Sequence, residues 1–131
     1  MSYAFARGIN TYRQTEVQSR TPLELIVMLY DGAIRFIGDA RDAIENRDIA
    51  RRGHSISRAL AIISELQSSL DMTAGGEIAS SLDVLYNFVR DRLVDGSMRQ
   101  DVRSLDEAVR VLKTLREGWV GIASTTPPPA R

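Results

Sequence analysis

The sequence predicts an all-α protein, an antiparallel up-down four-helix bundle with a mobile N-terminal leader. Apolar residues recur at steps of three and four along most of the chain, a spacing typical of amphipathic helices. Glycine and proline cluster at a few places and divide this pattern into segments of similar length. The chain has 131 residues, of which 44% are hydrophobic and 26% charged. That length favours one domain, able to bury roughly two thirds of the surface of its unfolded chain.

The leader is predicted over residues 1–20, which are polar with scattered apolar positions. The first helix should begin at Thr21-Pro22, because the Thr21 hydroxyl can cap the amide of Glu24 and proline is tolerated in a first turn. It should run for about 25 residues and end near Asn46. Its expected core positions are Ile26, Leu29, Ala33, Ile37, Ala40 and Ile44.

Three further helices follow. Asp48 is the expected N-cap of the second, which extends to Leu70. After the break at Gly75-Gly76, the third carries the expected core positions Ile78, Leu82, Leu85, Val89 and Leu93, and should stop at Asp95-Gly96-Ser97. The fourth begins around Asp101, with Trp119 expected to plug the end of the bundle. The predicted bundle domain is therefore 21–123, and the proline-containing tail 124–131 is expected to be disordered.

The connections fix the topology. Only one or two residues separate the first two helices, so these helices must run antiparallel. The four helices are alternately acidic and basic along the chain. Neighbours in an up-down ring then carry opposite charge, which weakly supports this arrangement.

Composition excludes several classes of protein. The 17 Lys and Arg residues balance the 17 Asp and Glu residues, which argues against nucleic-acid binding. No cysteine is present, so disulfides, thiolate zinc sites and cysteine nucleophiles are excluded. The apolar runs are too short for a membrane span, and the first residues lack a signal-peptide pattern. We therefore expect a cytoplasmic location without direct membrane insertion.

No catalytic, metal or cofactor site is predicted. The single histidine, His54, lies between Arg52 and Arg58 on an expected polar face. Asp39, Asp42 and Glu45 should face water, and the chain has no Glu-x-x-His pair of the kind that holds metals inside bundles. Gly75-Gly76 lacks the preceding strand and the Lys-Ser/Thr pair of a phosphate loop. We therefore do not expect an enzyme.

The first and third helices carry more apolar residues than a single core-facing stripe requires. Such an excess predicts either a partner-binding face or a wider core, and the leader is a candidate cover for it. We predict that Tyr30 lies at the edge of the core and forms a groove wall with Ile34, where Gly32 permits close approach of a bound backbone. The candidates on the third helix are Val84, Tyr86 and Phe88, and those in the leader are Ile9 and Tyr12.

The chain resembles the family of the flagellar secretion chaperone FliS over about residues 8 to 120, in an ordered set of short motifs. The motifs at the start are Gly8-Ile9-Asn10-Thr11-Tyr12, Thr21-Pro22-Leu23-Glu24-Leu25-Ile26 and Met28-Leu29-Tyr30-Asp31-Gly32-Ala33. Those further along are Ile62-Ile63-Ser64-Glu65-Leu66, Ser69-Leu70-Asp71, Gly75-Gly76-Glu77-Ile78-Ala79, Leu85-Tyr86, Arg92-Leu93, Leu105-Asp106-Glu107 and Leu115-Arg116-Glu117-Gly118-Trp119. The stretch 95–98 and the tail depart from the family pattern.

The resemblance implies an export chaperone that binds the disordered C-terminal segment of flagellin in the cytoplasm and prevents premature polymerisation. It further implies presentation of flagellin to the cytoplasmic domain of the membrane export gate. By position, Ile9 and Tyr12 would plug the binding groove and contact the gate. An anti-sigma factor and other late-export proteins stay open as partners of the same surface. The alternative function is a helical adaptor without a flagellin client.

Overall fold

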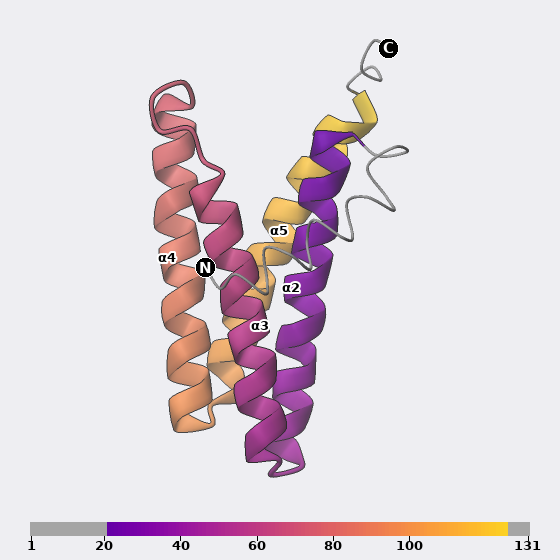
Figure 1. Cartoon of the computed structure of the whole chain (residues 1–131), viewed down its shortest axis with the longest axis vertical. Helices are drawn as coiled ribbons and strands as arrows, with labels where there is room; N and C mark the ends of the chain where they lie inside the picture. The colour runs from indigo at the N-terminus through magenta and orange to yellow at the C-terminus, as the bar shows by residue number, and fades with distance from the viewer. Residues whose placement is uncertain (1–20, 126–131) are drawn as a thin grey trace.

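The computed structural model describes residues 21–125 and places four helices in that range (Figure 1). They are α2 (Pro22–Glu45), α3 (Ile49–Ser68), α4 (Gly76–Arg99) and α5 (Val102–Thr125). Helix α2 packs against α3 and α5, and α4 packs against the same two helices. The predicted all-α four-helix bundle is therefore confirmed, with chain neighbours adjacent and α5 closing the ring onto α2.

The predicted N-cap residues of α2 and α3 form the expected hydrogen bonds. The Thr21 hydroxyl accepts a hydrogen bond from the Glu24 amide at 3.1 Å. The Asp48 carboxylate accepts one from the Arg51 amide at the same distance. Each bond satisfies an amide that has no partner within the first turn of its helix. Between α2 and α3, Arg47 adopts a positive φ of 57°, which allows the chain to reverse in three residues.

The core runs along the bundle axis and receives side chains from every helix. Its buried members are Tyr30, Ala33, Ile37, Ala40, Ile56, Ala59, Ile62, Ile63, Leu66, Leu82, Tyr86, Val89, Leu93, Leu105, Ala108 and Leu112. On α2 the fully buried positions begin only at Tyr30, and the preceding two turns are half-buried at most positions.

The helices do not stay parallel along their whole length. Figure 1 shows the pair α2 and α5 diverging from the pair α3 and α4 at the end where α2 begins and α5 ends. We call this the open end, and the opposite end, with the α2–α3 and α4–α5 turns, the closed end.

Two expected boundaries are corrected. Helix α4 does not stop at Asp95-Gly96-Ser97 but continues to Arg99, and Gln100 ends it in the left-handed conformation with φ 52°. Gly96 stays helical because it lies against Leu105 of α5: a Cβ atom at Gly96 would be 2.6 Å from Leu105 Cδ2. At the other boundary, α5 continues to Thr125, two residues past the expected domain limit.

The contact at Gly96 gives a testable prediction for stability. Gly96→Ala should lower the free energy of unfolding by about 1–3 kcal/mol, because the added methyl group overpacks against Leu105. Gly38→Ala is the matched control, since a methyl group added there would meet no heavy atom within 4 Å, and it should gain up to about 1 kcal/mol of helix propensity. Urea unfolding of both variants measures the difference. Equal stability of the two would show that the helices shift freely at this crossing.

Candidate functional site: an apolar pocket at the open end

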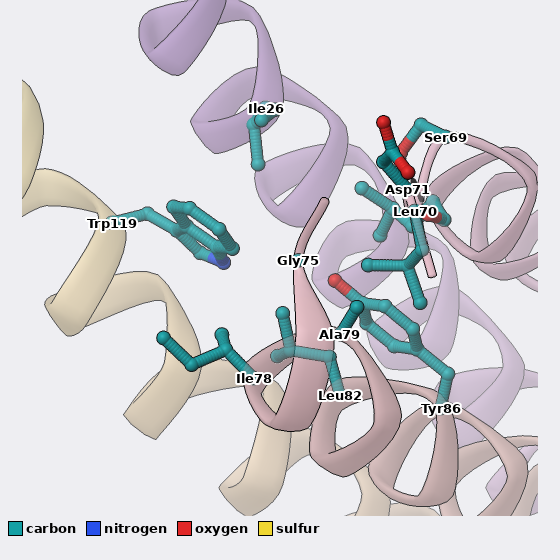
Figure 2. Close-up of a pocket in the computed structure, with 11 residues that line it drawn as sticks. Ile26, Ser69, Leu70, Asp71, Gly75, Ile78, Ala79, Leu82, Tyr86 and Trp119 are labelled. Carbon is teal, nitrogen blue, oxygen red and sulfur yellow. Dashed lines mark hydrogen bonds between the residues drawn. The ribbon is translucent and has the colours of Figure 1, made fainter. Parts of the chain in front are cut away.

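An apolar pocket with a volume of about 200 Å³ lies where the two helix pairs diverge (Figure 2). Helix α2 contributes Ile26, one turn from its start, and α5 contributes Trp119, near its end. The remaining lining residues come from the end of α3, the following turn and the first turns of α4: Leu66, Ser69, Leu70, Asp71, Gly75, Ile78, Ala79, Leu82 and Tyr86. The pocket therefore exists because four helix termini meet at one end without closing on each other.

The mouth and the floor of the pocket differ in exposure. Ile78 is 73% exposed, so its expected place in the core is wrong. The physical reason is that α4 begins only two residues earlier, at the diverging end, where no helix covers its first turn. Trp119 is half-buried and packs against the core, but it borders an open pocket instead of sealing the bundle.

The buried Tyr86 lines the pocket, and Tyr30, which is not a lining residue, is hydrogen-bonded to it. The hydroxyl groups of Tyr30 on α2 and Tyr86 on α4 are 2.6 Å apart and share a hydrogen bond, and the ring centroids are 6.4 Å apart. Tyr30 is 0% and Tyr86 1% exposed, so the predictions that Tyr30 lies at the edge of the core and that Tyr86 lies beyond it are wrong. Each ring fills the bundle interior while its hydroxyl finds a partner there, which is how a buried tyrosine avoids an unpaired polar group.

Burial raises the pKa of both phenols above the ordinary value of 10.0 by disfavouring the phenolate. For Tyr30, hydrogen bonding with Tyr86 and Trp119 partly offsets this rise in pKa. For Tyr86, the hydrogen bond with Tyr30 raises the pKa further. Both side chains are therefore neutral at physiological pH.

A second apolar feature lies on the outer face of α4 and consists of Val84 and Phe88, which we call the outer α4 patch. Val84 is 67% and Phe88 40% exposed, so the prediction that both lie off the core is confirmed. The guanidinium carbon of Arg92 is 5.9 Å from the centroid of the Phe88 ring. Of the other candidates, Ile34 is half-buried against the core, and Ile9 and Tyr12 lie outside the described residues.

Among residues 21–125, no cluster of three or more His, Asp or Glu side chains has the geometry to hold a metal ion. Asp39 forms an ion pair with Arg51 at 3.6 Å, and His54 is exposed. Within the same range, no helix is long and apolar enough to cross a membrane.

Sequence reasoning finds the excess of apolar residues but not the pocket itself. Ile26 and Leu82 are predicted as core positions, and in the structure both also line the pocket. Their positions in the sequence could have indicated the pocket. Each lies within two turns of a helix start, at the end of the bundle that also carries Trp119.

Comparison with known proteins assigns this chain to a family. The model of the flagellar protein FliS family matches residues 5–126. The flagellar secretion chaperone FliS of Salmonella typhimurium is 36% identical over 123 residues, covering 90% of this chain and 91% of that protein. The chaperone of the same name in Bacillus subtilis is 34% identical over 116 residues, covering 88% of this chain and 86% of that protein.

The bundle thus falls into a class of proteins that act by binding and not by catalysis, since the relatives are named secretion chaperones. The chain belongs to the FliS family of flagellar proteins. A third relative, the flagellar secretion chaperone FliSB of Pseudomonas aeruginosa, is 33% identical over 121 residues, covering 89% of this chain and 96% of that protein.

The raised pKa of the tyrosine pair predicts a loss of stability at alkaline pH. Their contribution is fully present below the unfolded-state pKa of 10.0, because both states are then protonated. Above that pH the unfolded chain releases phenol protons that the folded chain keeps, so the free energy of unfolding falls as pH rises. Denaturant unfolding between about pH 8 and pH 12 should show this fall. The double variant Tyr30→Phe with Tyr86→Phe should lose less stability over the same range, and parallel curves for the two proteins would contradict the prediction.

Proposed function

We propose that this protein is a cytoplasmic export chaperone that binds the disordered C-terminal segment of flagellin, prevents its premature polymerisation and delivers it to the flagellar export apparatus. Membership of the FliS family supports the export role. The observation that carries the binding role is the apolar pocket at the open end, together with the outer α4 patch. Apolar surface of this kind usually marks a binding site.

The physics of holding a disordered chain fits these surfaces. A disordered segment loses conformational entropy when it orders, so it needs a large apolar contact area to bind at all. The pocket accepts one or two apolar side chains by its size, and the outer α4 patch extends the contact to another side of the bundle. A client that wraps around the bundle reaches both, and Ile34 on α2 is a further expected contact. Burial of apolar surface of this kind needs no nucleotide or metal.

The leader is proposed as the cover of this surface in the absence of client. It precedes Thr21, and the pocket residue Ile26 lies only five residues further along the chain. A leader of 20 residues is therefore long enough to reach the pocket from the start of α2. Ile9 and Tyr12 are its proposed apolar contacts, and after displacement they are proposed to contact the cytoplasmic domain of the export gate.

A direct binding measurement tests the proposal. Isothermal titration of the full chain with the flagellin C-terminal segment should give a defined affinity and a negative heat-capacity change, because apolar surface is buried. The flagellin N-terminal segment serves as the control ligand. No binding of the C-terminal segment would contradict the flagellin client and favour a helical adaptor instead.

Phe88 provides a prediction that separates binding from folding. Phe88→Ala should weaken binding of the flagellin segment by about 1–3 kcal/mol if the ring anchors the client. Because the ring is 40% exposed, the same change should cost less than about 1.5 kcal/mol of stability, against about 3–5 for a fully buried ring. Met98→Ala is the matched control, since Met98 is 78% exposed on the same helix near the closed end. A large stability loss with unchanged affinity would place Phe88 among the structural residues.

The leader provides a prediction for hydrogen exchange. In the free protein, residues 1–17 should show weak protection, and the bound flagellin segment should reduce that protection because it displaces Ile9 and Tyr12. Mass-spectrometric exchange with and without the segment measures the change, and peptides from the closed end provide the internal reference. Equal or greater protection of the leader in the complex would rule out displacement.

A further inference from the structure

The polar groups around the pocket differ in whether their hydrogen-bonding capacity is used. At the rim, the Ser69 hydroxyl donates to the Leu66 carbonyl at 2.7 Å. The Asp71 carboxylate accepts from the amides of Thr73 and Ala74 at 3.1 Å and 2.9 Å. These bonds belong to the turn between α3 and α4, so the rim is satisfied within the fold.

The tyrosine pair beside the pocket has one hydroxyl proton that their shared bond does not use. The hydroxyl oxygens of Tyr30 and Tyr86 are 2.6 Å apart and share one hydrogen bond, in which either hydroxyl can be the donor. Each hydroxyl carries one proton, so the bond uses only one of the two. If Tyr30 donates, the remaining proton is on Tyr86, which lines the pocket. If Tyr86 donates, the remaining proton is on Tyr30, which is buried and is not a lining residue.

Donation by Tyr30 fits the structure better because Tyr86 lines the pocket. Figure 2 shows its hydroxyl pointing toward the space that the lining side chains enclose. In the free protein, a water molecule that enters through the open mouth can accept a hydrogen bond from the Tyr86 hydroxyl. A bound apolar side chain excludes that water, and an unpaired buried hydroxyl is unfavourable.

We propose that Tyr86 is a specificity-determining residue of the pocket, whose hydroxyl donates a hydrogen bond to a carbonyl oxygen of the bound client segment. This inference rests on the proposed chaperone function and adds the chemistry of what the pocket accepts. The occupant is an apolar side chain with a carbonyl oxygen beside it, either the side-chain amide of a neighbouring Asn or Gln or a backbone carbonyl at the end of a client helix, where carbonyls lack partners. A purely apolar occupant without such an oxygen binds less well, because the Tyr86 hydroxyl then has no acceptor.

Two variants isolate this hydroxyl. Tyr30→Phe removes the bond between the tyrosines but keeps the Tyr86 hydroxyl in the pocket, so its affinity for the flagellin C-terminal segment should stay within about twofold of the unmodified chain. The double variant Tyr30→Phe with Tyr86→Phe removes both hydroxyls and leaves no unpaired tyrosine oxygen in the core. Its affinity should fall about fivefold to tenfold, the effect of one neutral hydrogen bond. Equal affinities of the single and double variants would overturn the proposal.

A second measurement does not depend on the folding of either variant. In the unmodified chain, the Tyr86 hydroxyl proton should become slowly exchanging and visible by NMR when the segment binds, because it is then hydrogen-bonded and shielded from water. A proton that stays in fast exchange in the complex would also overturn the proposal. If the unmodified chain binds no flagellin segment at all, the proposed function fails first, and that result is distinct from both outcomes above.

The same variants show whether the client's acceptor is a side-chain amide or a backbone carbonyl. Each Asn and Gln of the segment is replaced by alanine and titrated against the single and the double variant. A position whose replacement weakens binding to Tyr30→Phe but not to the double variant identifies a side-chain amide as the acceptor. If every replacement changes binding to the single and the double variant equally, and the double variant still binds the unmodified segment more weakly, the acceptor is a backbone carbonyl.

Discussion

The hydrogen bond between Tyr30 and Tyr86 connects two pairs of helices, the two halves of the bundle, that diverge from each other at one end. One half is α2 with α5, joined by ion pairs of Asp31 with Arg116 and of Arg41 with Asp106. The other half is α3 with α4, where Arg90 bonds to Ser64 and Gln67. Among residues 21–125, polar side chains join the two halves through the Asp39–Arg51 pair near the closed end and through the tyrosine bond. Toward the open end, the tyrosine pair thus links the two halves from within the core.

Side-chain size explains why the halves separate at this level. From Tyr30 toward the closed end, the buried positions of α2 are mostly alanine, namely Ala33, Ala40 and Ala43, with Ile37 among them. Small side chains let helices approach closely, whereas two facing tyrosine rings need more room across the bundle. Between the start of α2 and Tyr30 no position of this helix is fully buried, and the space between the halves becomes the pocket. Both rings therefore belong to the core, and the Tyr86 ring also lines the pocket.

The fold was predictable from the sequence because its strongest signals are local. The Thr21 and Asp48 caps, the short connections and the helical apolar spacing each act within a few residues, and all are present in the structure. Prediction failed where the outcome depends on a partner from another helix. Gly96 was predicted to end the helix because its contact with Leu105 is not visible in the sequence. Tyr30 and Tyr86 were not predicted as buried because the sequence does not show that their hydroxyls share a hydrogen bond. Val84 and Phe88 were predictable because periodicity alone places them opposite the buried face of α4.

The difference between the open end and the closed end explains how a bundle of this size combines stability with an exposed apolar site. Most of the buried aliphatic core lies between the tyrosine pair and the closed end, whereas Leu66 and Leu82 belong both to the core and to the pocket lining. The first two turns of α2 and the last turns of α5 contribute little to that core, so local opening there costs less than global unfolding. The surface ion pairs of the α2–α5 half are exposed, and each contributes only about 0–1 kcal/mol. The open end can therefore adjust to an incoming apolar segment while the closed end keeps the four helices in register.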